Sequence, residues 1–324
     1  MTEPFLLTAP QAAPRLAARH PADRRAELHA QPIAYQGSKR RLASAILPLI
    51  PGGIRTWYEP FVGSGALALA VAHQGAAQKF TLGDSLFPLV QLWQAIVDAP
   101  DALAQTYAQL WHAQQPDPTA LFLKVRAEFN LDQDPGKLLY LLARCVKNAV
   151  RFNRAGAFNQ APDRRRLGTR PELMRSRLTS AHQALAGRVA IHACDYEVLL
   201  QQVTPEDLAY LDPPYVGVSG KVNQRYQQGL DLPRFIAALS LANERQIRYL
   251  VSLDGRTGSR SYGQPLPASL GLVHLELAAG RSSQATLLGR NEETFESLYV
   301  SPALHHSLLQ QGRWPLPASA ADTG

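Results

Sequence analysis

The sequence predicts an α/β fold in which a mostly helical, basic insertion interrupts a doubly wound, Rossmann-like sheet. Three observations support this prediction. A strand pattern, a glycine-rich turn and a helix pattern follow one another between residues 56 and 74. Five further strand patterns occur after residue 188. The region between them has helical periodicity and no strand pattern, which is typical of a helical insertion in a mostly parallel sheet.

The first predicted unit is a β-α-β motif. Its strand, tight glycine loop, helix and second strand are expected at Thr56–Phe61, Gly63-Ser64-Gly65, Ala66–Gln74 and Lys79–Leu82. Gly75 ends the helix, and the second strand leads to Asp84. Doubly wound sheets begin with such a unit.

The remaining elements follow in two groups. Helices are predicted near 88–97, 101–112, 119–130 and 136–149, and from Pro171 to about Leu185. Strands are predicted at Val189–His192, Leu208–Leu211, Tyr249–Leu253, Val273–Leu277 and Phe295–Val300. We therefore assign the sheet domain to 32–87 and 188–303, the insertion to 88–187, a disordered N-terminal tail to 1–31 and a C-terminal tail to 304–324.

Composition excludes several classes of protein. The chain has 324 residues, of which 46% are apolar, and no apolar run approaches the roughly 20 residues that a membrane span needs. Because the first residues of the chain show no signal-peptide pattern, we expect a cytoplasmic protein with no membrane partner. Its two cysteines, Cys145 and Cys194, are too few and too far apart for a disulfide framework or a zinc site.

The positive charge of the chain is concentrated in one segment. The net charge is +7, and between Arg144 and Arg188 eleven Lys or Arg residues face only two acids, Asp163 and Glu172. Such a segment can bind nucleic-acid phosphates, because neutralising them releases condensed counterions. The alternative is a solvated basic surface that serves solubility.

Gly63-x-Gly65-x-x-Ala68 lies directly after a predicted strand and at the start of a helix. Glycines at these positions let the backbone approach a nucleoside closely, and Asp84 stands where an acid can bind ribose hydroxyls. The pattern fits a nicotinamide cofactor and S-adenosylmethionine (SAM) equally well. A glycine-rich turn needed only for packing has the same appearance.

Asp212-Pro213-Pro214-Tyr215 follows the predicted strand Leu208–Leu211, and ligands bind at the carboxyl ends of strands in open α/β sheets. The prolines have no N–H to donate, so they present rigid carbonyl acceptors. The Asp212 carboxylate and the Pro213 carbonyl can each accept one hydrogen from an adenine amino group, which localises the nitrogen lone pair toward a methyl donor. Tyr215 would stack on the base, which must first be flipped out of a duplex. The alternative is a plain turn.

Four sequence blocks occur in a specific order. They are Tyr35-Gln36-Gly37-Ser38-Lys39, Glu59-Pro60-Phe61-Val62-Gly63-Ser64-Gly65, Arg151-Phe152-Asn153-x-x-Gly156-x-Phe158-Asn159 and Asp212-Pro213-Pro214-Tyr215. With these blocks the chain resembles the Dam-type class of SAM-dependent DNA adenine methyltransferases, over roughly residues 33–300. The resemblance implies a SAM-dependent methyltransferase fold whose insertion recognises the DNA target.

The resemblance also implies a cofactor site for SAM, with S-adenosylhomocysteine as the product and no metal. Its implied residues are Tyr35, Gly37, Lys39, Phe61, Gly63, Gly65, Asp84, Asp195 and Asp212. Asp84 would take the ribose hydroxyls and Asp195 would face the adenine of the cofactor. Asp195 has an alternative role as a helix N-cap, and Lys39 has one as an exposed lysine in the first turn of a helix.

The expected DNA contacts lie in the insertion, at Arg151, Asn153, Arg154, Arg164, Arg165 and Arg166. After Asn159 the chain departs from the family, which usually keeps a proline and a glycine close by. Polar loops near Arg256 and Gln284 either read base edges or are solvated turns.

The function expected from these features is site-specific methylation of the 6-amino group of adenine in double-stranded DNA, in restriction-modification or genome marking. A cognate restriction endonuclease is a possible partner, and a bacterial, nucleoid-associated location follows from DNA binding. The alternatives are methylation of RNA or of a protein amide, an inactive DNA-binding module and a nicotinamide-dependent dehydrogenase. Cytosine ring methylation is disfavoured, because neither cysteine follows a proline.

Overall fold

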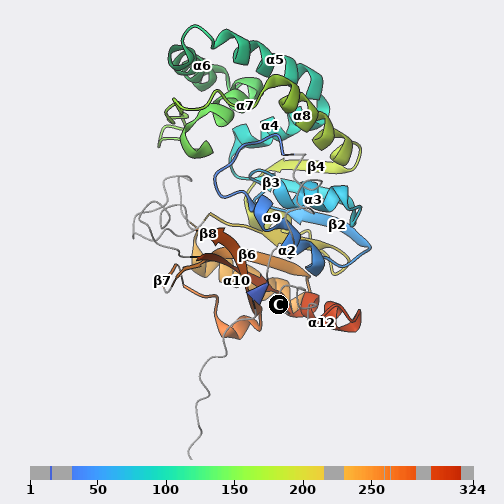
Figure 1. Cartoon of the computed structure of the whole chain (residues 1–324). Coiled ribbons are helices and arrows are strands. Elements are labelled where there is room, and N and C mark those ends of the chain that lie inside the picture. The colour runs from blue at the N-terminus through green and yellow to red at the C-terminus, as the bar shows by residue number, and fades with distance from the viewer. Residues whose placement is uncertain are drawn as a thin grey trace, which may run out of the picture.

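The computed structural model describes residues 15–16, 31–214, 230–258, 260–262, 264–281 and 293–314. Within these ranges the chain forms one mixed sheet with helices on both faces and a helical module beyond one end of it (Figure 1). Tyr215, Gln284 and most of the two expected tails lie outside the described residues.

The described strands belong to a single nine-stranded sheet. They are β1 (Arg15–Leu16), β2 (Ile54–Glu59), β3 (Ala77–Asp84), β4 (Val189–Ala193), β5 (Leu208–Leu211), β6 (Tyr249–Thr257), β7 (Arg260–Ser261), β8 (Val273–Arg281) and β9 (Glu293–Val300). Their order is β1-β8-β9-β6-β5-β2-β3-β4, and β7 pairs with β6.

The strand order creates one point where the direction of winding reverses. Strands β4, β3, β2, β5 and β6 are parallel, whereas β9 runs antiparallel between β6 and β8. The chain leaves β2 on one side for β3 and β4, and returns to the other side of β2 with β5. Open α/β sheets bind ligands at such a point, beyond the carboxyl ends of the strands. The candidate site is therefore expected beyond β2 and β5.

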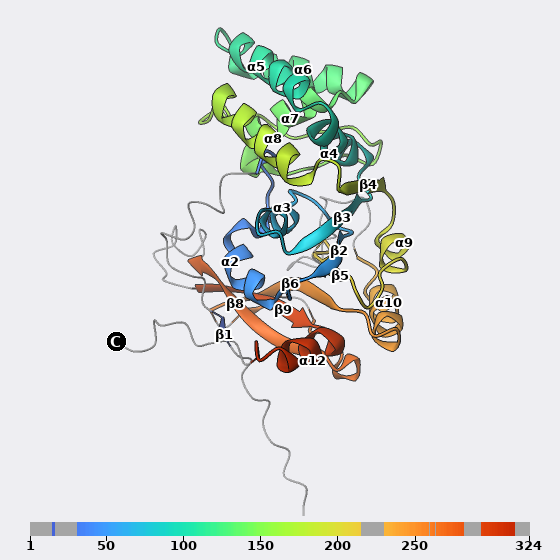
Figure 2. The same ribbon diagram turned by 90° about the vertical axis from the view of Figure 1, so that its right-hand side faces the viewer.

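Helices flank the sheet and form the module. The α-helices are α2 (Ala43–Ile46), α3 (Ala66–His73), α4 (Phe87–Asp98), α5 (Pro100–Ala113), α6 (Pro118–Asp132), α7 (Pro135–Arg144), α8 (Pro171–Leu185), α9 (Tyr196–Leu200), α10 (Leu232–Glu244) and α12 (Pro302–Gln310). Short 3-10 helices are η1 (Lys39–Arg41), η2 (Leu47–Leu49), η3 (Val146–Asn148) and η4 (Ala268–Leu270). Figure 2 shows α2 and α3 on one face of the sheet and α9 and α10 on the other.

The helical module shares a continuous apolar core with the sheet. Helix α4 packs against β3 and β4, and α8 packs against α3, α4 and α5. One buried cluster runs from Trp57 in the sheet through Trp93 in α4 to Phe129 in α6. A second cluster, around Phe235, fills the opposite face of the sheet. Helix α4, at the start of the insertion, thus also covers the sheet, while α8, at its end, packs on neighbouring helices.

The predicted strands and long helices are confirmed, and most differ from the observed elements only at their ends. The helix predicted at 136–149 is wrong at its end. Helix α7 stops at Arg144, because Cys145 is extended and Lys147 and Asn148 have positive φ angles of 58° and 50°. Left-handed backbone at non-glycine residues does not continue an α-helix.

The expected tails need two corrections. The segment from 304 onward begins as helix α12, because the Ser301 side chain caps its N-terminus and Leu304 and Leu308 pack into the core. In the N-terminal segment, Arg15 and Leu16 pair with β8 and extend the sheet. Among the described residues, no helix is both long and apolar enough to span a membrane.

Candidate active site

The glycine loop and the Asp-Pro-Pro segment meet at the carboxyl ends of β2 and β5. Gly63 from the first segment and Asp212 from the second line one pocket. Its lining residues are Tyr35, Gly37, Ser38, Lys39, Glu59, Phe61, Val62, Gly63, Ser64, Ala66, Leu67, Tyr210 and Asp212. Three of the four sequence blocks contribute residues at or beside this pocket, although they are distant in the chain.

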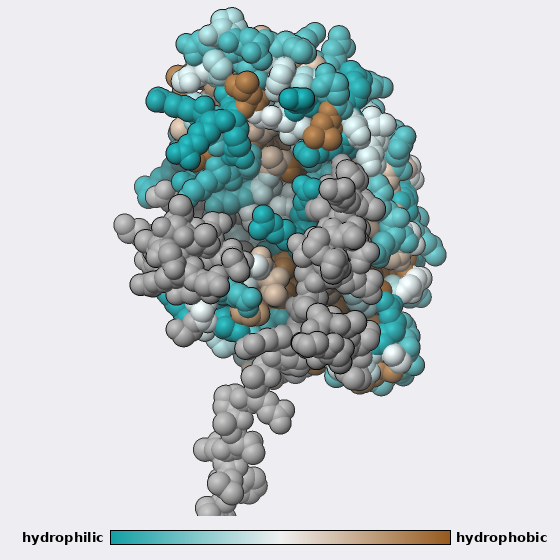
Figure 3. Space-filling view, viewed as in Figure 1, coloured by the Kyte–Doolittle hydropathy of each residue, from teal (hydrophilic) through white to brown (hydrophobic). Residues whose placement is uncertain are grey.

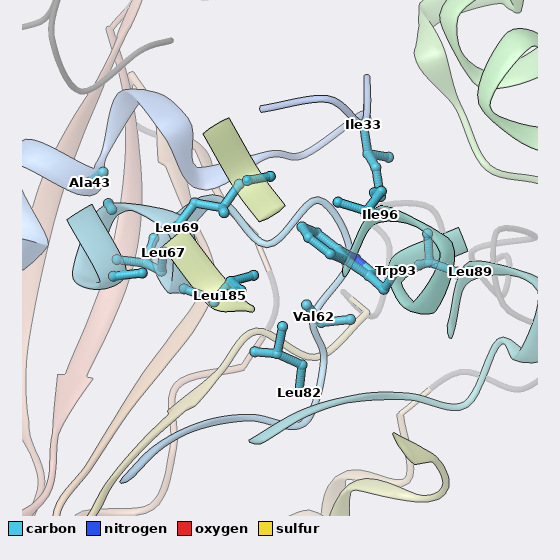
Figure 4. Close-up of a cluster of buried hydrophobic side chains, with 14 of the residues drawn as sticks. Ile33, Ala43, Val62, Leu67, Leu69, Leu82, Leu89, Trp93, Ile96 and Leu185 are labelled. Carbon is cyan, nitrogen blue, oxygen red and sulfur yellow. The ribbon is translucent and has the colours of Figure 1, made fainter. Parts of the chain in front are cut away.

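The glycine loop needs glycine for two different reasons. Gly63 and Gly65 have positive φ angles of 47° and 60°, a region that side chains with a Cβ rarely occupy. A Cβ on Gly65 would also lie only 2.7 Å from Cη2 of Trp93 and closer still to Cζ2. Trp93 is fully buried and donates from Nε1 to the Gly63 carbonyl at 3.0 Å. Figure 4 shows this ring packed near Val62, beside the glycine loop.

Lys39 connects two carboxylates that come from different strands. Its Nζ lies 3.0 Å from Asp212 Oδ1 and 2.9 Å from Glu296 Oε2, and the side chain is 3% exposed. Burial alone would lower the pKa of Lys39, but the attraction of Asp212 and Glu296 outweighs it and raises the pKa. Lys39 is therefore a buried, charged lysine, and the exposed-lysine alternative is wrong.

Asp212 lies directly after β5, and its side chain is 20% exposed. Burial raises its pKa to about 7, and the negative charges of Glu296 and Asp254 act in the same direction, while Lys39 opposes them. The adjacent Pro213 is buried and Pro214 is half-buried. Asp212 thus has a pKa close to neutral pH, and the two prolines after it have no N–H group to donate. This segment is therefore suited to accept hydrogen bonds.

Glu59 was missed as a site residue in the sequence, although it lies in one of the four blocks. It ends β2, is 3% exposed and lines the pocket. Its Oε2 accepts a hydrogen bond from Trp57 Nε1 at 2.9 Å, and burial raises its pKa to about 8. An acid at the end of an apolar strand was the available signal, because buried acids usually have a specific role.

Asp84 holds the glycine loop by hydrogen bonds. Its Oδ2 accepts from the Gly63 amide at 3.3 Å and its Oδ1 from the Leu86 amide at 2.9 Å. Burial raises its pKa to about 6. Asp84 is not among the pocket-lining residues, so its contact with ribose hydroxyls stays a prediction.

Asp195 caps α9, the alternative role considered for it from the sequence. Its side chain accepts from the Glu197 amide at 3.0 Å and forms an ion pair with Arg234 at 3.2 Å. The next residue, Tyr196, stacks on Phe61 with ring centroids 5.2 Å apart. Because Phe61 lines the pocket, α9 lies near one side of it. A contact between Asp195 and the cofactor stays a prediction.

The segment that carries Tyr35 and Gly37 joins the pocket to the helical module. The Tyr35 ring lies against Gly63, where an added Cβ would meet it at 3.4 Å. The Gln36 amide donates to the Asn148 carbonyl at 2.9 Å. Gly37 has a φ of 91° and is exposed. The first block is thus fixed between the glycine loop and the segment that follows α7.

The predicted DNA-contacting residues lie in the loop between α7 and α8. Arg151 and Arg154 are exposed, and Arg164 and Arg165 are exposed as well. Figure 3 shows hydrophilic side chains gathered on the side of the helical module where this loop lies in Figure 1. The structure thus places a basic surface beside the pocket-bearing domain.

Two of the predicted DNA-contacting residues, Asn153 and Arg166, also stabilise the loop itself. Asn153 Oδ1 accepts from the Ala155 and Ala157 amides at 3.0 and 2.9 Å, so this side chain organises a turn. Arg166 donates to Asp163 at 2.8 Å and lies 3.4 Å from Asn148 Oδ1. Their DNA contacts stay predictions.

Arg256, considered as a reader of base edges, is engaged within the sheet. It donates to both carboxylate oxygens of Glu276, at 2.6 and 2.8 Å, and stacks over the Phe295 ring at 4.1 Å. This geometry favours a structural role. Among the described residues, no group of three or more His, Cys, Asp or Glu side chains is arranged to hold a metal ion.

Comparison with known proteins identifies a family. The family model of the D12 class N6 adenine-specific DNA methyltransferases matches residues 35–248. This range spans the segment of Tyr35, the glycine loop, the whole insertion and the Asp-Pro-Pro segment.

Individual relatives match with lower identity and different coverage. The type II methyltransferase M.MjaIII of Methanocaldococcus jannaschii is 23% identical over 56% of this chain and 68% of its own length. The modification methylase StsI of Streptococcus sanguinis is 28% identical over 59% of this chain and 29% of its own length. A DNA adenine methylase of Haemophilus influenzae is 24% identical over 68% of this chain and 78% of its own length. The match thus spans less than a third of one of these relatives.

Proposed function

Since this chain belongs to the D12 class of N6 adenine-specific DNA methyltransferases, we propose that Asp212-Pro213-Pro214-Tyr215 is its catalytic loop. We propose further that the enzyme acts at a specific site in duplex DNA, on an adenine flipped out of the helix. The observation that carries this proposal is the meeting of Asp212, Lys39 and the glycine loop in one pocket at the reversal point of the sheet.

The pocket fits SAM, the cofactor that membership of a methyltransferase family implies. Among the described residues that line it are two acids with raised pKa values, Glu59 and Asp212, and one cation, Lys39. A positively charged ligand beside the two acids would favour their ionised forms and would be attracted by them. Gly63 lines the pocket and has no side chain that would keep its backbone away from a nucleoside bound there. When bound, SAM supplies a methyl group on a sulfonium: the carbon–sulfur bond breaks as the carbon–nitrogen bond forms, and sulfur keeps the electron pair as S-adenosylhomocysteine.

The catalytic loop would make the adenine amino group nucleophilic. The Asp212 carboxylate and the Pro213 carbonyl each accept one of its two hydrogens, which opposes delocalisation of the lone pair into the ring. After transfer the nitrogen must lose one proton, and a carboxylate with a pKa of about 7 is suited to accept it. Lys39 orients this carboxylate through the 3.0 Å contact. Tyr215, which follows the prolines, would stack on the base.

DNA would bind across the basic loop between α7 and α8. Exposed arginines there, Arg151, Arg154, Arg164 and Arg165 among them, can contact backbone phosphates without reading sequence. The connection from Gln36 to Asn148 supports the proposal, because it ties this loop to the pocket.

We propose a role in restriction-modification or in genome marking. The names of the relatives include type II methyltransferases and a modification methylase, beside a DNA adenine methylase. A cognate restriction endonuclease would accompany the first role and would be dispensable for the second. Action on chromosomal DNA supports a location in the cytoplasm with the nucleoid.

The test is to incubate the purified protein with tritiated SAM and unmethylated genomic DNA, and to identify the labelled nucleoside after digestion. We expect label in N6-methyldeoxyadenosine, and none when Asp212→Ala replaces the wild type. Thermal unfolding of the variant checks that it is folded. Label in cytosine, label only in an RNA control, or methylation retained by folded Asp212→Ala would contradict the proposal.

A further inference from the structure

We propose that Glu296 is a positioning residue for methyl transfer, which acts by sharing the Lys39 ammonium with Asp212. The inference rests on the proposed function of Asp212. Glu296 lies on β9, outside the four sequence blocks and beyond the residues that the family model matches. The 2.9 Å contact between Glu296 Oε2 and Lys39 Nζ links this strand to the pocket.

The sheet separates Glu296 from the loop that it would influence. Strand β6 lies between β5, which leads to Asp212, and β9, which carries Glu296. Lys39 reaches both carboxylates from η1, a three-residue helix whose N-cap makes no side-chain hydrogen bond. A lysine on a flexible four-carbon stem is poorly fixed by one partner. The second carboxylate defines where the ammonium sits, and thereby where it holds Asp212.

The charges around Lys39 include two acids that face each other across neighbouring strands. In the register of β6 and β9, Glu296 lies directly opposite Asp254, and like charges in such a pair are destabilising. Buried ion pairs are in general weak contributors to stability, because desolvation offsets their attraction. Several acids at one edge of the sheet, beside the buried Lys39, therefore indicate a functional arrangement.

The acids near Asp212 suit a reaction in which positive charge moves toward the adenine nitrogen. Methyl transfer carries a positive charge from the sulfonium toward the adenine nitrogen, so fixed negative charge near that nitrogen favours the transition state. Among the described residues, Lys39, Glu296 and Asp254 act on the charge of Asp212, which in turn acts on Glu59 and Tyr210. Of these, Glu296 is the acid that contacts the same lysine as Asp212. Its removal would take away one of the two carboxylates that hold the Lys39 ammonium at 2.9 and 3.0 Å.

The experiment compares Glu296→Gln with wild type and with Glu276→Gln in the full chain. Glutamine keeps the shape of the side chain and removes its charge. Glu276 is the matched control, because it is a half-buried acid on the neighbouring strand β8 that pairs with a cation, Arg256, away from the pocket. The readouts are tritium transfer to unmethylated genomic DNA across pH at saturating SAM, SAM affinity by calorimetry, and thermal unfolding.

For Glu296→Gln we expect the plateau rate to fall about 10- to 100-fold, as for small misplacements of a reacting group. SAM affinity should stay within about threefold, since Glu296 would act on the transition state rather than on cofactor binding. The acid limb of the rate profile should move to lower pH, because the negative charge of Glu296, which raises the pKa of Asp212, is removed. Glu296→Asp, which keeps the charge, should keep the acid limb in place.

Three outcomes would overturn the inference. One is a Glu296→Gln enzyme with the rate and the pH profile of the wild type. Another is a loss of rate without a shift of the acid limb and matched by Glu276→Gln, which would show a general loss of sheet stability. If Glu296→Gln does not fold, a folded Glu296→Asp with the rate of the wild type would equally contradict it, because aspartate is one methylene shorter and would lose the 2.9 Å contact with Lys39. By contrast, an enzyme whose activity survives Asp212→Ala would refute the proposed function itself, and the inference with it.

Discussion

Replacing Gly65 by alanine tests the packing that shapes the glycine loop. Alanine at a φ of +60° costs about 1–2 kcal/mol relative to a residue in the right-handed region. Its Cβ would also overlap the six-membered ring of Trp93, with contacts of 2.7 Å and shorter. Forcing extra volume into a packed core costs about 1–3 kcal/mol. Displacing the ring would break the bond from Trp93 to the Gly63 carbonyl, which adds about 1 kcal/mol.

Gly75 provides the matched control for Gly65. It lies at the other end of α3 with a φ of +64°, and a Cβ there would meet no atom within 4 Å. Gly75→Ala therefore incurs the backbone cost alone, about 1–2 kcal/mol, and both variants share the effect of alanine on the unfolded chain. The expected difference between the two variants is about 2–4 kcal/mol, or roughly 3–6 °C in Tm for a chain of 324 residues.

Thermal unfolding of both variants measures this difference in stability, and calorimetry measures the affinity of each variant for SAM. Gly65→Ala should also weaken SAM binding, whereas Gly75→Ala should not. Trp93→Phe removes the ring atoms that the new Cβ would meet, so the double variant Gly65→Ala/Trp93→Phe should lose less stability than the sum of the single variants. Equal Tm values for Gly65→Ala and Gly75→Ala, or additive losses in the double variant, would refute the packing argument.

Two further predictions concern pH and salt. Because the ionised form of Asp212 accepts hydrogens and its pKa is raised to about 7, kcat/KM should fall about tenfold per pH unit below that value; a profile flat down to about pH 5.5 would contradict this. Neutralising Arg164, Arg165 and Arg166 together should weaken DNA binding and reduce the slope of log K against log salt by about 0.9 for each phosphate that the variant no longer neutralises. The control Lys79→Gln, at the amino end of β3, should leave that slope unchanged. An unchanged slope in the triple variant would show that these arginines form a solvated surface and do not contact DNA.

Features encoded locally could be predicted from the sequence. The strand Leu208–Leu211 and the helix Pro171–Leu185 occur at the predicted bounds, because a short apolar run and an N-terminal proline are local signals. The glycine loop and the Asp-Pro-Pro segment were likewise predicted to follow strands. Because ligands bind beyond the carboxyl ends of the strands in open α/β sheets, both segments could be expected at the binding site.

Features that depend on contacts between distant segments could not be predicted. Glu296 gave little sign of a role, since its partner Lys39 comes from a distant part of the chain. Glu59 has a near partner in Trp57, but its burial depends on the packing of distant segments. Asp195 had two readings that local sequence cannot separate, and its N-cap geometry was visible only in the folded chain. Helix α12 was missed because its apolar face is short and depends on packing against the sheet.

The sequence by itself thus determined the α/β class, the order of most elements and the residues of the Asp-Pro-Pro-Tyr loop, because periodicity, proline and glycine act on neighbouring residues. Only the tertiary structure decided the insertion of β9 between β6 and β8, the ring of Trp93 against Gly65 and the sharing of Lys39 between Asp212 and Glu296. These depend on which distant segments lie side by side. Burial then strengthens the interactions between their charges, because the local dielectric is low.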